Sequence, residues 1–554
     1  MKIDLKLDGT DYSVNAGISI LQLLKDKEAY KIPLTLAAWV NNCAVSLNYL
    51  LAQNHETIEL ITADMAVGRA IHRQSVAFLL NRVIFDLFRN SRIVLGAALG
   101  NSYYYDFYTD IPVNEELLKE IALQMHLLIE KNEIFENFTL SKEEAIDYFR
   151  KRGFYNKLKL VEQLDRKYIS IYSCGPYKDI DLGTLAPHAG YIGNFWLKRY
   201  SRGFILYYGP ESEKEHYLVQ LGRRAKLFAA FIESKRWGQI IEVNNVHRLN
   251  EVILSQRIQD VVNICEGLHE KKIGQIADQI LLGKNKQKIR LILISGPSSS
   301  GKTTFTQRLA IHLRINGIKP MSISLDNYYI DRDKTPLDEN GNYDFENIAA
   351  LDLPLLNEHL QDLINGNEVE MPLYDFETGK RRSKTKVLRI DEYQPLILEG
   401  IHALNPVLTS SISDSFKFKI YVSALTPLAI DDYNRISSSD NRLLRRMVRD
   451  FHFRGYRAED TIDRWPLVRA GEEKWVFPFQ EEADVLFNSA HHFELSLLKM
   501  EAEQLLKKID TSLPAHRVAV RLLSFLSIFQ PIAPEYIPAT SILREFVGGS
   551  CFNY

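Results

Sequence analysis

Apolar and polar positions follow different periods along the chain, and these periods divide it into segments. Residues 1–62 alternate charged and apolar positions in KIDLKLDG and YSVNAG, which predicts a hairpin that turns at Asp8-Gly9. A short helix and two more strands are expected after this hairpin. Residues 211–288 repeat apolar positions at helical spacing, which predicts a helical connector. Residues 496–554 are expected to form a C-terminal tail, with one amphipathic helix and a proline-punctuated end.

The most informative segment is a buried-strand pattern, LILIS, that runs into GPSSSGKT and then into a periodic helix. This order satisfies GxxxxGK[ST], the phosphate-binding P-loop. Two glycines let the backbone curl so that successive N–H groups point at phosphate oxygens, and the new helix presents its positive end to the same anion. We expect Lys302 to contact the outer phosphates and the Thr303 hydroxyl to bind Mg²⁺. The residues expected to bind ATP here are Gly296, Pro297, Ser298, Ser299, Ser300, Gly301, Lys302, Thr303 and Thr304.

Composition narrows the class of protein. The 554 residues are 46% hydrophobic and 25% charged, which is an ordinary balance for a multidomain globular chain. A net charge of −2 gives no overall attraction to nucleic acid or anionic membrane, although local basic patches are not excluded. The four cysteines form no CxxC pair, and no apolar stretch is long enough to span a bilayer or act as a signal peptide. A reduced cytoplasmic protein without a membrane partner is expected.

The N-terminal half resembles part of the threonyl-tRNA synthetases. Residues 1–62, with DGT near the start and AAWVNNCAVSLNYLL before the last strand, resemble a TGS domain, which is a β-grasp module. Residues 63–210 resemble the editing-type domain that follows TGS in that family, on AIHRQSVAFLL, NSYYYDFYTDIPV and ISIYSCGPYKDIDLG. The family pairs an HxxxH helix with a C-x-x-x-H segment. Here His72 remains, whereas Val76, Ser173 and Tyr177 stand at the other positions. We therefore expect a retained scaffold or binding surface without metal or hydrolytic activity.

Residues 289–495 resemble the uridine kinase branch of P-loop enzymes. The resemblance is carried by ISLDNYY, MPLYDFETGKRR, PLILEGIHAL and NRLLRRMVRDFHFRG, and no guanine-specific NKxD strand end follows the P-loop. The expected fold is therefore α/β, with a parallel-sheet P-loop kinase domain preceded by a β-grasp module and an α+β editing-like domain. ATP and Mg²⁺ are the cofactors that the resemblance implies.

Charged residues at two strand ends and on one helix carry the expected chemistry. Asp326 ends an apolar strand and is expected to act as catalytic base and to help hold Mg²⁺; a capping or loop role is the alternative. Glu399 ends PLILE and is expected beside the metal, unless it is only an ion-paired strand end. Arginines at i, i+3, i+4 and i+7 form one helical stripe, which is a lid over ATP or only a solvated face. This stripe contains Arg442, Arg445, Arg446 and Arg449, with Arg454 beyond it; Arg445 is expected to stabilise transferred charge, and Arg446, Arg449 and Arg454 to bind ATP.

The acceptor pocket is the least defined part of the expected site. By the same resemblance, the residues expected to contact a nucleoside are Tyr329, Tyr374, Phe376, Arg442 and Asp326, with either Asp344 or Glu346 on the ribose. Where the family has a base-reading histidine, this chain has Gly379, which predicts a broader or shifted nucleoside choice. A kinase of another small alcohol and an RNA-binding regulator acting through the N-terminal half are the alternatives. A homo-oligomer is a further open hypothesis.

Overall fold

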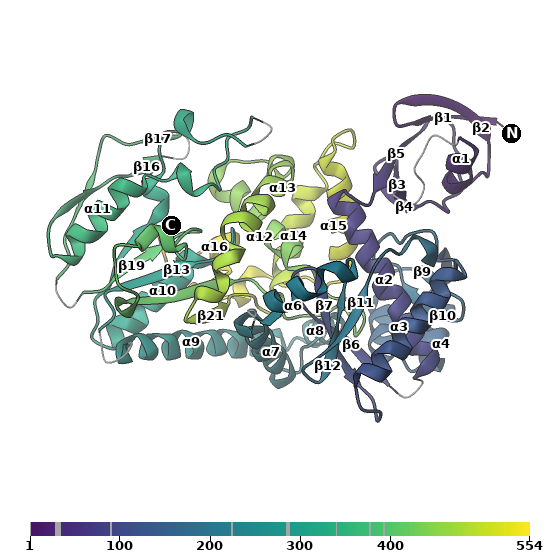
Figure 1. Cartoon of the computed structure of the whole chain (residues 1–554), viewed down its shortest axis with the longest axis horizontal. Helices are drawn as coiled ribbons and strands as arrows, with labels where there is room; N and C mark the ends of the chain where they lie inside the picture. Colours follow the sequence, from purple (N-terminus) through teal and green to yellow (C-terminus); the bar gives the residue numbers. More distant parts are fainter. Residues whose placement is uncertain are drawn as a thin grey trace.

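The computed structural model describes residues 2–27, 35–88, 91–222, 225–283, 288–338, 341–375, 378–391 and 394–553. Within these ranges, no helix combines the length and the apolar character that crossing a membrane requires. The N-terminal module lies at one end of the molecule and the P-loop sheet at the other, with the C-terminal helices between them (Figure 1).

The N-terminal module has the β-grasp arrangement that its sequence predicts. The strand order is β2-β1-β5-β3-β4, with β1 parallel to β5 and the other neighbours antiparallel. Asp8 and Gly9 form the predicted hairpin turn with φ angles of 46° and 86°, the left-handed region that a tight hairpin turn requires. The elements of the module are β1 (Lys2–Leu7), β2 (Thr10–Asn15), α1 (Ile20–Asp26), β3 (Thr35–Val40), β4 (Cys43–Ser46) and β5 (Glu56–Thr62).

The next region contains two antiparallel sheets and several helices, an α+β arrangement as expected. One sheet has the order β11-β12-β7-β6 and the other β10-β9-β8. Helix α2 is buried on all sides from Ser75 to Ile84, so it forms the centre of this region's core. The elements are α2 (Ala66–Leu87), β6 (Arg92–Ala98), β7 (Ser102–Tyr108), α3 (Glu115–Glu130), β8 (Glu136–Ser141), α4 (Lys142–Lys151), α5 (Tyr155–Gln163), β9 (Tyr168–Cys174), β10 (Tyr177–Ile180), the 3₁₀ turn η2 (Ala189–Tyr191), β11 (Trp196–Tyr200) and β12 (Gly203–Tyr207).

Helices connect this region to the P-loop sheet. The longest, α9, runs beside the helix that follows the P-loop (Figure 1). Arg308 of that helix pairs with Glu266 and Glu270 of α9 at 3.3 and 2.8 Å, which fixes the two helices against each other. The connecting elements are η3 (Glu211–Glu213), α6 (Lys214–Gly222), α7 (Ala225–Ile240), α8 (Val246–Leu254) and α9 (Ile258–Leu282).

The P-loop region is a five-stranded sheet in which every neighbouring pair is parallel. The order is β14-β19-β13-β20-β21, and all residues of the central strand β13 are buried, because helices cover both faces of such a sheet. The carboxyl ends of β13, β14 and β19 meet at one edge, where ligands bind in such folds. The expected α/β fold is confirmed. The main elements are β13 (Leu291–Ser295), α10 (Lys302–Ile315), β14 (Met321–Ser324), η4 (Leu325–Tyr328), α11 (Leu353–Ile364), β19 (Leu396–Glu399), β20 (Lys417–Ser423), α12 (Ser438–Arg454), α13 (Ala458–Trp475) and β21 (Val485–Asn488).

Short elements fill the connections of this sheet. Two small antiparallel ribbons, β15 with β18 and β16 with β17, lie between α11 and β19. The short elements are η5 (Arg332–Lys334), η6 (Ile348–Ala350), β15 (Val369–Met371), β16 (Tyr374–Asp375), β17 (Lys380–Arg381), β18 (Lys386–Leu388), η7 (Pro406–Thr409), η8 (Asp414–Phe416) and η9 (Phe477–Glu482).

The C-terminal residues pack into the same core as the P-loop sheet. Ile542 and Phe546 are fully buried and belong to the hydrophobic cluster that contains Ile292 of β13. Arg517 reaches the N-terminal module, where it pairs with Glu59 and lies over the ring of Trp39 at 4.3 Å. This segment therefore joins the two ends of the molecule. Its elements are α14 (Glu494–Leu506), α15 (Ala515–Leu526), η10 (Pro534–Tyr536) and α16 (Arg544–Val547).

Candidate active site

The P-loop has the tight backbone that its glycines predict. A Cβ atom at Gly296 would lie 2.0 Å from the carbonyl oxygen of Val422, so no side chain fits there. Gly301 has φ of 81° and begins α10, and a Cβ there would lie 2.4 Å from the side chain of Ile542. The loop therefore runs against β20 on one side and against the C-terminal segment on the other, a path that only glycine allows.

Carboxylates of the chain itself face the anion-binding donors of this loop. The Ser298 amide donates to Glu472 of α13 at 2.9 Å. The amide and hydroxyl of Thr304 both donate to Glu545, at 3.3 and 2.8 Å. Lys302 donates to the Pro297 carbonyl at 3.2 Å. The donors at the start of α10 thus already hold negative charge, as the helix dipole favours.

Two acids expected from the sequence lie at neighbouring strand ends. Glu399 ends β19, and Asp326 follows β14, which pairs with β19 in parallel. One oxygen of Glu399 lies 3.5 Å from the Thr303 hydroxyl and 3.4 Å from the Ser324 hydroxyl. Its other oxygen, Oε2, is buried and has no hydrogen-bond partner among the described residues. A buried oxygen without a partner costs free energy, so Glu399 is suited to receive a ligand there.

The charges at this edge perturb one another. Burial raises the pKa of Glu399 to about 7, with the charges of Asp326 and Glu545 adding to the rise and Lys302 opposing it. Burial likewise lowers the pKa of Lys302, although Glu399, Asp326 and Glu545 oppose this effect. A cation that reached these carboxylates would favour their ionised forms. The Thr303 hydroxyl and the carboxylates of Asp326 and Glu399 are hard oxygen donors, which fit Mg²⁺.

The arginine stripe of α12 faces the P-loop rather than solvent. Arg442 donates to the Ser298 carbonyl at 2.9 Å and pairs with buried Glu472. Arg446 donates to the Ser298 hydroxyl at 2.8 Å. Arg445 is fully buried, where it pairs with Glu494 and donates to the Ser489 carbonyl at 3.1 Å. Arg445 contacts the loop through the Ser299 carbonyl at 3.4 Å, whereas Arg446 contacts it through the Ser298 hydroxyl.

The outer end of the stripe is organised by an acid that the sequence reasoning missed. Asp450 of α12 lies 3.2 Å from Arg446, 2.6 Å from Arg449 and 3.7 Å from Arg454. These arginines hold the pKa of Asp450 below its usual range against the effect of burial. The i, i+4 spacing to Arg446 and Arg454 was the available signal for this cluster.

The expected acceptor residues Tyr329 and Glu346 lie close enough to Asp326 for their charges to interact. The rings of Tyr329 and Tyr374 are 5.7 Å apart, and the Tyr329 hydroxyl donates to the Phe345 carbonyl. Burial raises the pKa of Glu346 to about 7. The charges of Arg446 and Lys302 oppose this rise, and that of Asp326 adds to it. Asp344 instead accepts from the Asn347 side chain at 3.3 Å within its own turn. The geometry therefore favours Glu346 over Asp344 as a site residue. Phe376 lies outside the described residues.

An arginine takes the place beside Gly379. A Cβ at Gly379, where φ is 69°, would lie 2.6 Å from Nε of Arg332. The Arg332 amide also donates to the Gly379 carbonyl at 2.9 Å. Burial raises the pKa of Tyr374, and the charge of Arg332 opposes this rise. Sequence reasoning missed Arg332, because it lies on η5, which precedes the ribbon that carries Gly379.

Three of the four positions compared with the editing-type site are buried. Val76 and Tyr177 are fully buried in the core of that region, and Ser173 is buried beside β8. The Tyr177 hydroxyl donates to Asp179 at 2.8 Å. His72 accepts a hydrogen bond from the Gly193 amide at 3.1 Å. The core positions thus lack the exposed donors that a metal or a hydrolytic water would need.

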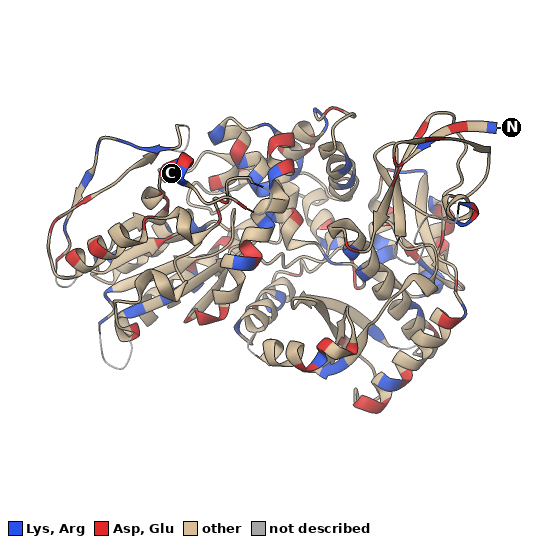
Figure 2. Ribbon diagram, turned by 45° about the horizontal axis from the view of Figure 1, so that its top comes forward, with Lys and Arg blue, Asp and Glu red and all other residues tan. Residues whose placement is uncertain are grey.

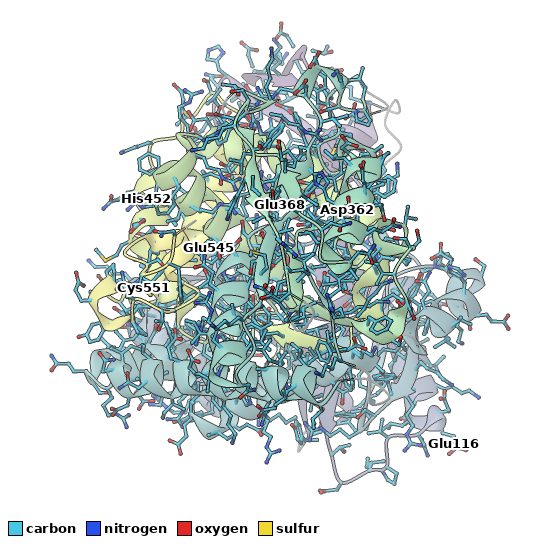
Figure 3. The ribbon with its side chains drawn as sticks, turned by 90° about the vertical axis from the view of Figure 1, so that its left-hand side faces the viewer. Glu116, Asp362, Glu368, His452, Glu545 and Cys551 are labelled. Carbon is cyan, nitrogen blue, oxygen red and sulfur yellow. The ribbon has the colours of Figure 1, made fainter. Side chains whose placement is uncertain are left out.

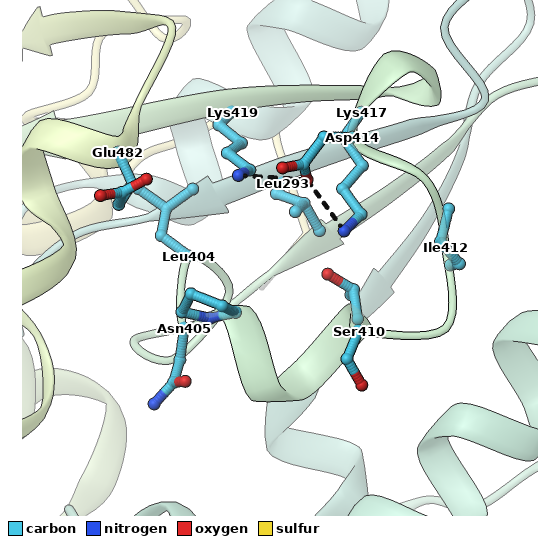
Figure 4. Close-up of a pocket in the computed structure, with 11 residues that line it drawn as sticks. Leu293, Leu404, Asn405, Ser410, Ile412, Asp414, Lys417, Lys419 and Glu482 are labelled. Atoms are coloured by element: carbon cyan, nitrogen blue, oxygen red, sulfur yellow. Dashed lines mark hydrogen bonds and ion pairs between the residues drawn. The ribbon is translucent and has the colours of Figure 1, made fainter.

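Two other features of the described chain bring charged or metal-ligating side chains together. Glu266, His269 and His491 bring possible ligand atoms within 4.8 Å of one another. Glu266 already pairs with Arg308 at 3.3 Å, and this guanidinium disfavours a metal ion there. A pocket beside η7 and β20 contains Lys417 and Lys419, and Asp414 pairs with both, at 3.1 and 3.3 Å (Figure 4). In both features an acid is already paired with a basic side chain of the protein, so neither is favoured over the P-loop as the candidate site.

Comparison with known proteins agrees with this geometry. The model of the phosphoribulokinase/uridine kinase family matches residues 291–496. A uridine kinase of Macrococcus caseolyticus is 32% identical over 200 residues, which cover 36% of this chain and 87% of that enzyme. The chain belongs to the phosphoribulokinase/uridine kinase family. A solved structure described as a possible uridine kinase from Bacillus stearothermophilus is 20% identical and covers 39% of this chain and 98% of its own, with a TM-score of 0.28.

The other half of the fusion is similar to a different enzyme. A threonine–tRNA ligase of Desulforamulus reducens is 30% identical over 215 residues, which cover 39% of this chain. The chain spans only about a third of the length of that ligase. Together the two groups of relatives confirm the expected fusion of a uridine kinase-like domain with threonyl-tRNA synthetase-like modules.

Proposed function

We propose that the protein transfers the γ-phosphoryl group of ATP to the 5′-hydroxyl of a nucleoside. Membership of the phosphoribulokinase/uridine kinase family makes it a P-loop kinase. The observation that carries the finer proposal is the gathering of Lys302, Glu399, Asp326 and Glu346 at one sheet edge, next to the paired rings of Tyr329 and Tyr374.

Each of these residues has a distinct part in the proposed reaction. Asp326, at the end of β14, accepts the proton of the attacking hydroxyl. Lys302 and Arg446 stabilise the negative charge that spreads over the transferred group. Mg²⁺, held by Thr303, Glu399 and Asp326, would neutralise charge on the outer phosphates. Helix α12, whose arginines already contact the loop, would help to exclude water from the transfer.

The acceptor is held by two kinds of contact in this proposal. The faces of Tyr329 and Tyr374 stack on a base of any identity, and Glu346 accepts hydrogen bonds from the ribose hydroxyls. Gly379 contributes no side chain, whereas Arg332 brings donors to the same place, which would favour bases with exposed carbonyl oxygens. We therefore expect a nucleoside choice that is broader than, or shifted from, that of a uridine and cytidine kinase.

A panel of acceptors tests this proposal. We would measure kcat/KM for uridine, cytidine, inosine, adenosine and guanosine with the full chain, ATP and Mg²⁺. Comparable values for several nucleosides are expected, with Arg332→Ala changing their order. If no nucleoside is phosphorylated but another small alcohol is, the acceptor assignment is wrong and the kinase assignment remains.

The relationship to threonine–tRNA ligases favours an additional RNA contact through residues 1–210. The net charge of −2 argues against strong nonspecific binding, so any contact should depend on RNA shape. Binding of the full chain to tRNA, measured against an unstructured RNA of equal length at physiological salt, tests this candidate. Equal affinity for both RNAs would remove it.

A further inference from the structure

The C-terminal segment 541–553 lies against the end of the P-loop at which α10 begins. In sequence, this segment follows the residues that the family model covers. The side chain of Ile542 packs on Gly301, and Gln307 of α10 donates to the Asn553 carbonyl at 2.8 Å. The ring of Phe546 lies 4.9 Å from the Arg445 guanidinium, beneath the same loop. The segment is therefore part of the wall around the start of α10.

Glu545 of this segment occupies donors that phosphate would use. Thr304 is the third residue of α10, and its amide is one of the donors that a helix leaves unpaired at its N-terminus. P-loops bind phosphate with such amides, and the P-loop lysine reaches the outer phosphates. Because Glu545 accepts from both the amide and the hydroxyl of Thr304, a phosphate oxygen cannot use them at the same time.

The backbone around Glu545 is fixed, although its side chain is not enclosed. Ile542, Leu543 and Phe546 are fully buried, and Arg544 donates to the Pro534 and Ile537 carbonyls at 2.9 and 2.6 Å. Glu545 itself is half-buried and lies on the same face as Cys551 (Figure 3). The side chain can therefore turn into water while the segment stays in place.

We propose that Glu545 is a built-in competitor of the nucleotide. Its carboxylate holds the Thr304 donors in the free protein, and ATP binds once this side chain turns outward. The apparent affinity for ATP is then the intrinsic affinity multiplied by the fraction of molecules with Glu545 turned out. The segment thereby sets the ATP concentration at which the enzyme begins to work. This proposal rests on the proposed use of ATP by the P-loop.

Equilibrium binding of a fluorescent ATP analogue with Mg²⁺ to the full chain tests the proposal without any acceptor. Glu545→Gln removes the charge and keeps the shape, and Glu545→Ala also removes the acceptor oxygen. We expect the dissociation constant to fall about threefold to tenfold, with the alanine variant tighter than the glutamine variant. Glu535→Gln, which changes an exposed acid of the same C-terminal region, is the matched control and should leave the constant unchanged. Unchanged or weaker binding in both Glu545 variants would overturn the proposal.

A second measurement separates side-chain rotation from release of the whole segment. Amide hydrogen exchange of residues 542–547 should stay slow with and without the analogue, because the backbone is expected to remain packed. Faster exchange on binding would overturn the side-chain description. If the wild-type chain binds no nucleotide at all, the proposed function fails. If it binds and the Glu545 variants match it, only the present inference fails.

Discussion

The candidate functional positions of the two halves of the molecule have different surroundings. In the kinase half, acids and bases converge on one sheet edge, the pKa of Glu399 and of Glu346 is raised to about 7, and Glu399 has a buried oxygen without a partner among the described residues. In the N-terminal half, Val76 and Tyr177 fill a hydrophobic core. Positive and negative residues are distributed over both halves, so charge alone does not distinguish them (Figure 2). What differs is the kind of residue at the candidate positions: charged groups at a strand edge in the kinase half, and core residues in the N-terminal half.

This difference has a physical meaning. A buried polar atom without a partner destabilises the fold, so its presence beside a ligand site indicates that a ligand completes it. A position taken over by an apolar or hydrogen-bonded core residue contributes to stability and has no free donor for chemistry. Four predictions test the contrast, beginning with the largest expected effect.

Lys302→Ala and Asp326→Asn should each lower kinase turnover by about two orders of magnitude or more, because they remove charge stabilisation and the proposed base. Turnover is measured with an acceptor that supports wild-type activity. Lys319→Ala, at an exposed position near the end of α10, is the control and should be silent. Near-normal turnover in both site variants would show that Lys302 and Asp326 are not catalytic residues.

Glu346→Gln should lower kcat/KM for the nucleoside roughly tenfold to a hundredfold, since hydrogen bonds to a charged acceptor contribute about 1.5–3 kcal/mol. Asp344→Asn should change it much less, because Asp344 is engaged with Asn347 in its own turn. Both substitutions keep the side-chain shape. A larger effect from Asp344→Asn would reverse the assignment that the geometry favours.

The raised pKa of Glu399 should make stability depend on pH. Between its ordinary value of 4.5 and about 7, the folded state binds the proton more tightly than the unfolded state. The stabilisation is therefore complete below about 4.5 and is lost as pH rises through about 7. Without Mg²⁺, the melting temperature of the wild type should fall from pH 5 to pH 8 by on the order of 2 °C more than that of Glu399→Gln. Parallel pH profiles for the two proteins would contradict the burial of this carboxyl.

Local patterns predicted the parts of the site that are close in sequence. The strand, loop and helix of the P-loop follow from adjacent residues, and so does the hairpin turn at Asp8-Gly9. Glu472 and Glu545 could not be predicted in this way, because they reach the P-loop from 174 and 241 residues away in the sequence. Their positions depend on how α13 and the C-terminal segment pack in three dimensions.

The smallest effect is expected in the N-terminal half. His72 accepts from the Gly193 amide, and burial lowers its pKa, so the imidazole is neutral near pH 7. One neutral imidazole beside core residues cannot assemble the ligands that a metal or an activated water requires. The wild-type chain should therefore leave mischarged threonine-type tRNA intact and contain no stoichiometric zinc, and His72→Ala should keep kinase kcat/KM within about twofold of the wild type. A threonine–tRNA ligase with an intact HxxxH motif serves as the positive control for hydrolysis. If the wild type hydrolyses this tRNA and His72→Ala abolishes the hydrolysis, the N-terminal half has a hydrolytic site that depends on His72, and the prediction is wrong.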